Sequence, residues 1–233
     1  MDLIPGFCQH LVCMLISYPF DVVKTNMQTN GLSMKESIIT IWKRGPQSFY
    51  RGVTLGLSIG AIGKSFQYYT YEHLNKKVNP FLSGWIVGFL SGFYSTPLQS
   101  ITSNALLDHT YNGNIINYSK NYIQEHSIKR LFKGLKVDLL RMSIFTSLHL
   151  GLYGNLRSKT NNHIINGIIA NIMSWVFVFP FDTIRTRLQT SNLNYRQISY
   201  QHLWRGFTPL VIRTVPSAGI GMYIYEKTRQ YVI

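Results

Sequence analysis

Apolar residues dominate six stretches of this chain, and each stretch is long enough to cross a lipid bilayer as a helix. They lie near residues 4–28, 53–76, 82–107, 135–157, 163–189 and 207–230. A hydrocarbon core of about 30 Å requires roughly 20 helical residues. Polar residues interrupt every stretch at a few positions. This pattern predicts an all-α membrane protein in which six transmembrane helices turn polar stripes toward water and their other faces toward lipid.

Polar stretches with a weaker apolar period lie between these segments. From residue 33 to residue 43, Met34, Ile38 and Trp42 alternate with charged residues, a pattern typical of an amphipathic helix on a membrane surface. Residues 118–131 and 195–203 are weaker counterparts. We therefore expect a short surface helix between the two long helices of each pair.

The first, third and fifth long segments share a ten-residue string. Residues 180–189 read Pro-Phe-Asp-Thr-Ile-Arg-Thr-Arg-Leu-Gln, residues 19–28 read Pro-Phe-Asp-Val-Val-Lys-Thr-Asn-Met-Gln, and residues 97–104 are a degenerate copy. The prolines are 78 and 83 residues apart, which indicates a threefold repeat. We assign one domain, 1–233, with repeats 1–78, 79–160 and 161–233. Because proline removes a helical hydrogen bond, these three helices are predicted to kink and to close a cavity at one end.

Three further markers recur in the same order. A glycine precedes each proline by thirteen residues, an aromatic-base-glycine triplet follows it, and a tyrosine follows that triplet by nineteen residues. The members are Gly6, Gly84 and Gly167; residues 50–52, 132–134 and 204–206; and Tyr71, Tyr153 and Tyr225. In the second repeat Gly84, Gly88 and Gly92 are spaced four apart, which favours close helix packing.

At these residues the chain resembles the mitochondrial carrier family, whose three repeats each carry Pro-x-[Asp/Glu]-x-x-[Lys/Arg]. The resemblance covers nearly the whole chain. It implies a transporter rather than an enzyme, without a cofactor or metal, that moves a solute by alternating access. It also implies a multi-pass protein of the inner mitochondrial membrane (of a host cell if the chain is virally encoded).

The resemblance implies a gate on the matrix side, formed by the signature residues of the three repeats. Its residues here are Asp21, Lys24, Gln28, Gln99, Thr102, Asp182, Arg185 and Gln189. In the family each acid pairs with the base of the next repeat, so Asp182 is expected to pair with Lys24. Thr102 replaces the base opposite Asp21, and Gln99 replaces the acid opposite Arg185. We therefore expect one full ion pair, with Gln28 and Gln189 as supporting glutamines.

A second gate is implied at the cytoplasmic ends of the even-numbered segments. Its residues are Tyr71, Glu72, Asn75, Tyr153, Arg157, Tyr225, Glu226 and Arg229. Only the third repeat keeps both charges of the family pattern, and Glu72 is expected to pair with Arg157. The alternative is ordinary capping, because basic residues near helix C-termini complement the helix dipole.

The resemblance also implies contact points for the solute seven residues after each triplet glycine. These are Ile59, Arg141 with Met142, and Arg213, and Lys64 lies near the same depth. Arginine forks suit phosphate or carboxylate, and a charge at mid-depth must face a wet cavity. We therefore expect an anionic solute, with a nucleotide first and a keto acid, an amino acid or an adenosyl cofactor as alternatives. An alternative for Arg141 is an ion pair with Asp138, one turn away on the same helix.

Charge adds a lipid to the expected partners. Lys and Arg number 23 against 9 Asp and Glu, a net charge of +14 that indicates anionic partners. The base-glycine pairs that open the even-numbered segments offer N–H groups and a cation to a phosphate, which by resemblance is that of cardiolipin. They are Arg51-Gly52, Lys133-Gly134 and Arg205-Gly206. The alternative is that these pairs are simple helix starts.

Three other function classes are alternatives to a transporting monomer. The degenerate second repeat is compatible with a carrier-fold interaction protein that no longer transports. A basic nucleic-acid-binding protein is disfavoured by six segments of lipid-spanning length. An enzyme is disfavoured because no phosphate loop, metal-ligand cluster or nucleophile–base signature is visible, and Cys8 and Cys13 form no disulfide framework.

Overall fold

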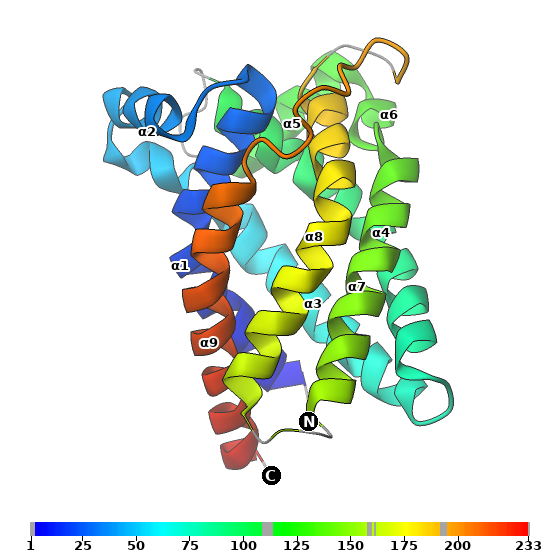
Figure 1. The fold of residues 1–233 in the computed structure, drawn as a ribbon. Coiled ribbons are helices and arrows are strands. Elements are labelled where there is room, and N and C mark those ends of the chain that lie inside the picture. The colour runs from blue at the N-terminus through cyan, green and yellow to red at the C-terminus, as the bar shows by residue number, and fades with distance from the viewer. Residues whose placement is uncertain (1–2, 109–113, 158–159, 161, 192–194, 233) are drawn as a thin grey trace.

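Six long helices make up the body of the protein in the computed structural model, which describes residues 3–108, 114–157, 160, 162–191 and 195–232. They are α1 (Leu3–Asn30), α3 (Val53–Asn75), α4 (Pro80–Leu107), α7 (Leu135–Arg157), α8 (His163–Thr190) and α9 (Phe207–Val232). Each packs against the next along the chain, and α9 packs back against α1 (Figure 1). The all-α fold predicted from the sequence is confirmed in the described residues, and the helices begin and end close to the predicted limits.

The helices carry apolar side chains on their outer faces and polar side chains inside. Phe66 of α3, Trp85 of α4 and Phe177 of α8 are exposed, whereas Gln67 of α3 and Ser174 of α8 are buried. This is the reverse of a water-soluble protein, in which buried polar groups are the exception. Judged by length and average composition alone, one described helix, over Ile164–Thr190, is apolar enough to span a membrane. The polar residues on the inward faces lower the mean hydropathy of the other five long helices.

Short helices gather at one end of the bundle, opposite the end that holds both chain termini (Figure 1). They are α2 (Met34–Lys43), the 3-10 helix η1 (Pro46–Tyr50), α5 (Ile115–His126) and α6 (Ile128–Leu131). Ser33 and Glu36 form a reciprocal cap at the start of α2. The hydrogen bond from the Ser33 N–H lowers the pKa of the Glu36 carboxyl. The predicted surface helices of the first two repeats are thus present.

The predicted surface helix at residues 195–203 is wrong, because this segment forms turns. Arg187 at the end of α8 donates hydrogen bonds to the carbonyl oxygens of Ser199, Gln201 and His202, the last two at 2.9 and 3.4 Å. Those carbonyls are the groups that a helix would use internally. His202 also adopts a left-handed conformation, with φ of 52°. The third connection is therefore held by a side chain of α8 and not by its own helical hydrogen bonds.

The glycine row of the second repeat packs against the backbone of α7. A Cβ placed on Gly84 would lie 2.8 Å from Ser147 Cα, and one on Gly88 would lie 2.7 Å from Ser143 Cα. These distances are too short for a side chain, so the glycines permit the approach of α4 to α7. Gly52, Gly134 and Gly206 of the aromatic-base-glycine triplets serve a different purpose, since all have φ between 77° and 93° and make the turns into α3, α7 and α9.

The three repeated prolines, Pro19, Pro97 and Pro180, lie inside α1, α4 and α8 as predicted. A fourth, Pro216, lies inside α9. Beyond the repeated prolines, each of α1, α4 and α8 continues for about three more turns toward the end with the short helices. The signature residues therefore lie together at that end of the bundle.

Candidate functional site

A cavity of about 350 Å³ lies between the long helices. Its lining combines basic, acidic and apolar residues from all six of them, among them Asp21, Lys24, Lys64, Gln99, Arg141, Met142, Asp182, Arg185 and Arg213. A neighbouring cavity of about 290 Å³ shares Asp21, Lys64 and Arg213 with it and reaches Gln9 of α1 and Gly167 of α8. The two are lobes of one space that extends toward the end with the chain termini.

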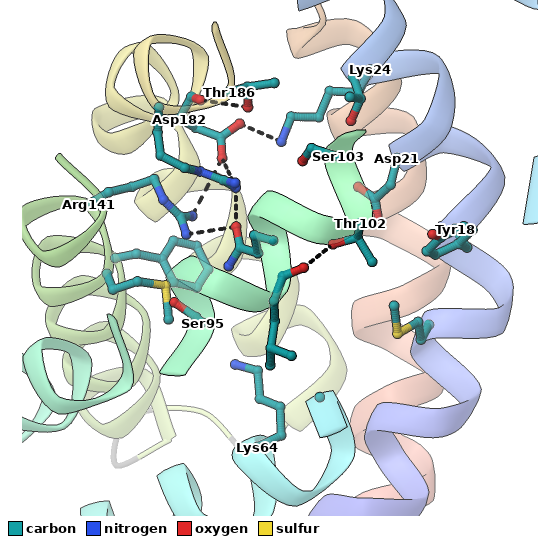
Figure 2. Close-up of a pocket in the computed structure, with 18 of the residues that line it drawn as sticks. Tyr18, Asp21, Lys24, Lys64, Ser95, Thr102, Ser103, Arg141, Asp182 and Thr186 are labelled. Atoms are coloured by element: carbon teal, nitrogen blue, oxygen red, sulfur yellow. Dashed lines mark hydrogen bonds and ion pairs between the residues drawn. The ribbon is translucent and has the colours of Figure 1, made fainter. Parts of the chain in front are cut away.

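Charged side chains close this space at the end with the short helices. We call Lys24, Asp138, Arg141, Asp182 and Arg185 the ring cluster. Lys24 Nζ lies 2.5 Å from Asp182 Oδ2, which is the ion pair expected from the signatures. Arg141 and Arg185 place guanidinium nitrogens 3.5 and 3.6 Å from the other oxygen of Asp182. Figure 2 shows Lys24 and Arg141 reaching toward Asp182 from different helices.

Glutamines complete the hydrogen bonds of the ring cluster. Gln28 Nε2 donates to Asp182 Oδ2 at 3.2 Å, and Gln189 Oε1 accepts from Arg185 at 2.6 Å. Gln99 Oε1 accepts from Arg185 and, at 3.4 Å, from Arg141. The expected hydrogen bond between Gln99 and Arg185 is therefore present. Because these side chains are largely buried, the cluster separates the cavity from the end with the short helices.

Asp138 and Arg141 are the members of the ring cluster that sequence reasoning did not place there, since Arg141 was predicted as a solute contact and Asp138 only as its alternative partner. Asp138 Oδ1 lies 2.7 Å from Arg141 and 3.7 Å from Arg185, and the Asp138 side chain is fully buried. Of the two interpretations of Arg141, pairing with Asp138 is the one present in this structure. The sequence did hold a signal for this role. Asp138 lies four residues after its triplet glycine, where the other two repeats have the uncharged residues Gly56 and Leu210.

The expectation of a single full ion pair among the signature residues is wrong, because Asp21 and Arg185 also have charged partners. Arg185 pairs with Asp138 and Asp182. Asp21 lies 3.2 Å from Arg213 Nε, and the two side chains are 32% and 17% exposed. Asp138 and Arg213 lie outside the signature positions, where the family pattern did not point, whereas Asp182 is the signature acid of the helix that carries Arg185. Thr102, predicted opposite Asp21, donates instead to the Leu98 carbonyl of its own helix at 2.6 Å.

Lys64 is the cavity cation for which no ion pair is found among the described residues. Its Nζ donates to Gln67 Oε1 at 2.7 Å, and the Gln67 amide nitrogen donates to Ser91 and Thr146, both at 3.3 Å. Gln67 is thus oriented to accept from Lys64. Figure 2 shows Lys64 on α3, apart from the cluster around Asp182. Of the other predicted contact points, Met142 lines the cavity, whereas the Ile59 side chain lies outside the described part of the structure.

The cavity and its closed end together carry an excess of positive charge. Lys24, Lys64, Arg141, Arg185 and Arg213 face Asp21, Asp138 and Asp182, which leaves two positive charges uncompensated among these described side chains. Trp175 adds an aromatic face, because Lys24 Nζ and the Arg213 guanidinium lie 5.0 and 5.8 Å from its ring centre. The site is therefore suited to a solute that carries negative charge.

The residues of the predicted cytoplasmic gate are described in part. Tyr71 donates to the Leu150 carbonyl at 3.3 Å and so links α3 to α7. Glu72 and Tyr153 are partly buried, and Asn75 and Arg157 are exposed. The side chains of Tyr225, Glu226 and Arg229 lie outside the described part of the structure. The pairing of this gate stays a prediction.

Two of the three bases of the base-glycine pairs contact the ends of other helices. Lys133 Nζ donates to the Ser191 carbonyl at 2.8 Å, and Arg205 donates to the Gly31 carbonyl. Partial burial and the neighbouring Arg130 lower the pKa of Lys133. In the first repeat the Arg51 carbonyl accepts from Tyr18 Oη at 2.5 Å. Two of the three bases thus satisfy carbonyl groups just beyond the C-termini of α8 and α1.

The chain matches known proteins along its whole length. The model of a family described as mitochondrial carrier protein matches residues 1–80, 75–163 and 156–233. Mitochondrial substrate carrier family protein L of Dictyostelium discoideum is 26% identical over 99% of this chain and 95% of its own. A mitochondrial carrier-like protein of Acanthamoeba polyphaga mimivirus is 23% identical over 95% of this chain and 94% of its own.

A third relative has a name that includes its solute. Mitochondrial 2-oxodicarboxylate carrier 1 of Saccharomyces cerevisiae is 22% identical over 94% of this chain and 89% of its own. The threefold match of the family model agrees with the threefold recurrence of the proline signature. The chain therefore belongs to the mitochondrial carrier protein family, and it is a multi-pass protein of the inner mitochondrial membrane, as the sequence predicted.

Proposed function

We propose that the protein exchanges a small dianion across the inner mitochondrial membrane through six transmembrane helices, by alternating access. The outward apolar and inward polar faces of all six long helices support the six spans. The ring cluster closes one end of the cavity, and the second lobe extends toward the other. Because bases are abundant near the short helices, we assign the closed end to the matrix.

A dicarboxylate is the solute class that the cavity supports best. The lobe beside the ring cluster has about 350 Å³ and the neighbouring lobe about 290 Å³, and both together are within the roughly 300–1,000 Å³ typical of ligand pockets. The two uncompensated positive charges of the cavity match a dianion, and Lys64 is available as a donor. One relative is named for 2-oxodicarboxylate. The nucleotide that the sequence favoured carries more than two negative charges as ADP or ATP, which exceeds the two uncompensated positive charges, so we place it second.

Exchange in proteoliposomes tests the solute class. Purified protein is reconstituted, and uptake of labelled 2-oxoglutarate, ADP or arginine is measured with vesicles preloaded with the same compound. We expect 2-oxoglutarate uptake that requires internal dicarboxylate. ADP uptake without 2-oxoglutarate uptake would instead support the nucleotide. Failure of every solute, together with no thermal stabilisation by any of them, would overturn transport in favour of a carrier-fold interaction protein.

Replacing Lys64 by Gln is expected to raise the KM for the dicarboxylate about tenfold or more, because a charge-assisted hydrogen bond contributes about 1.5–3 kcal/mol. The fold should be little affected, since Lys64 pairs with no carboxylate among the described residues. Concentration-dependent uptake measures the effect. The matched control is Lys136→Gln, which removes the same charge from an exposed position of α7. Equal KM values for the two variants would remove Lys64 from the binding site.

We also propose that a lipid phosphate, that of cardiolipin, binds at the starts of α3, α7 and α9. The left-handed glycines 52, 134 and 206 make the turns into α3, α7 and α9. The N–H groups of Leu135 and Phe207 already donate to the Phe132 and Trp204 carbonyls, so the later N–H groups of the first turn are the ones offered to a phosphate. The contacts of Lys133 and Arg205 to carbonyl groups leave the backbone N–H groups as the principal donors. We propose a monomer, because the cavity is enclosed by helices of a single chain.

A further inference from the structure

We propose that Asp138 of α7 supplies the ring carboxylate that the second repeat lacks at Gln99. The inference rests on the alternating-access part of the proposed function and is independent of the solute. In the second repeat the signature position of the acid holds an amide, so Arg185 has no carboxylate there. Asp138 lies instead on the next long helix, in its first turn, with Oδ1 3.7 Å from Arg185 Nε.

The two oxygens of Asp138 have separate partners. Oδ2 accepts from Ser95 at 3.1 Å and from Thr96 at 2.8 Å, both on α4. Oδ1 accepts from Arg141 Nε at 2.8 Å and faces Arg185. The carboxylate is therefore held by two hydroxyl groups in an orientation that presents one oxygen to the two arginines. The Asp138 carboxylate is fully buried, and its hydrogen-bond and charged partners compensate for the loss of water. It is therefore part of the closed end and not a solvated surface charge.

Gln99 and Asp138 hold the same two guanidinium groups. Gln99 Oε1 accepts from Arg185 and Arg141, and Asp138 Oδ1 lies beside the same two side chains. The ring cluster as a whole has three cations and two carboxylates. A negative charge can therefore be moved from position 138 to position 99 and still face both arginines. If Asp138 acts through its charge, a carboxylate at position 99 can replace it. If Asp138 acts only through packing, a carboxylate at position 99 cannot.

The position of Asp138 also changes what opening requires. Asp138 and Arg141 belong to the same helix, whereas Arg185 belongs to α8 of the next repeat. Separation of α7 from α8 would break the contact with Arg185 and keep the pair with Arg141. The carboxylate would then remain neutralised in the open state, which avoids the large cost of a lone buried charge. At the signature position on α4, an acid would have no basic residue one turn away on its own helix.

A disulfide across the closed end provides a reporter that needs no solute. Thr29 Oγ1 of α1 and Thr190 Oγ1 of α8 lie 3.4 Å apart, beyond the ring cluster. Thr29→Cys with Thr190→Cys, in a Cys8→Ser and Cys13→Ser background, should cross-link under copper–phenanthroline when this end is closed. The rate of cross-linking in purified protein then reports how much of the protein is closed.

In this background Asp138→Asn should slow cross-linking about tenfold, because Arg185 and Arg141 lose one of the two carboxylates that they share. Adding Gln99→Glu to that variant should restore the rate to within about twofold, since the charge again faces both arginines. Gln99→Glu alone should cross-link at least as fast as the parent. The matched control is Glu125→Gln, which removes an exposed carboxylate of α5 and should leave the rate unchanged.

A parental rate for Asp138→Asn would overturn the proposal. So would a slow Asp138→Asn variant that Gln99→Glu fails to restore, because the carboxylate would then act through its contacts to Ser95 and Thr96. If Asp138→Asn does not fold, a folded double variant with the parental rate supports the proposal, and an unfolded double variant overturns it. Cross-linking is measured without solute. Its result therefore tests the role of Asp138 even if the transport assay fails, and failure of one proposal can be told from failure of the other.

Discussion

Replacing Asp182 by Asn is expected to cost about 3–5 kcal/mol in the free energy of unfolding, because the change leaves buried cations without their shared carboxylate. Lys24, Arg141 and Arg185 all lie within 3.6 Å of Asp182, whose side chain is 1% exposed. For a chain of this size such a loss corresponds to a fall in melting temperature on the order of 10 °C. Thermal unfolding of the purified protein in detergent measures it.

Asp21→Asn is the control for this prediction. Asp21 occupies the equivalent signature position in the first repeat, but it is 32% exposed and contacts Arg213 alone among the described cations. A partly exposed pair contributes little, about 1 kcal/mol or less. A fall in melting temperature for Asp182→Asn no larger than that for Asp21→Asn would show that the ring cluster is hydrated rather than closed.

The same geometry changes the expectation for Lys24. The signatures alone pair Asp182 with Lys24, so that Lys24→Gln would leave Asp182 without a cation. In the structure Asp182 keeps Arg141 and Arg185 after such a change, at 3.5 and 3.6 Å. We therefore expect a smaller loss for Lys24→Gln than for Asp182→Asn. The asymmetry follows from the number of opposite charges that each side chain faces.

Replacing Gly88 by Leu is expected to prevent the packing of α4 against α7. Even the first atom of a side chain would meet the Met142 carbonyl and would lie 2.7 Å from Ser143 Cα, so helix backbones and not flexible side chains would have to move. Overpacking costs about 1–3 kcal/mol per site, and displacing two backbones costs more. We expect loss of folded protein after purification, and Gly88→Ala should lower the melting temperature measurably.

Gly154→Ala is the matched control for the alanine variant, since a Cβ at that position of α7 would meet nothing closer than Tyr71 Oη at 3.8 Å. Both changes gain about 0.5–1 kcal/mol of backbone entropy, so a difference between them isolates the contact with α7. Gly154→Ala should be neutral or stabilising. Equal stability of the two variants would mean that the two helices are further apart than described.

Much of the architecture follows from local signals along the chain. The six long segments, the threefold repeat and the surface helices of the first two repeats were predictable because helix length, period and caps are properties of neighbouring residues. The pair of Lys24 with Asp182 was expected from the resemblance to the family, in which each signature acid pairs with the base of the next repeat. The turns of the third connection were not predictable from the sequence. Arg187 of the preceding helix holds residues 195–203 through hydrogen bonds to their carbonyl groups, and the local sequence pattern does not show this contact.

Only the tertiary structure decided the charge pairing inside the bundle. Sequence places Asp138 one turn from Arg141, but the approach of Arg185 from α8 and of Thr96 from α4 depends on which helix faces meet. The partnership of Asp21 with Arg213 joins the first and third repeats in the same way. Repeat spacing determines the depth of a residue along its helix. The partners of a charged side chain depend also on helix rotation and on the reach of flexible side chains, which become definite only when all six helices pack.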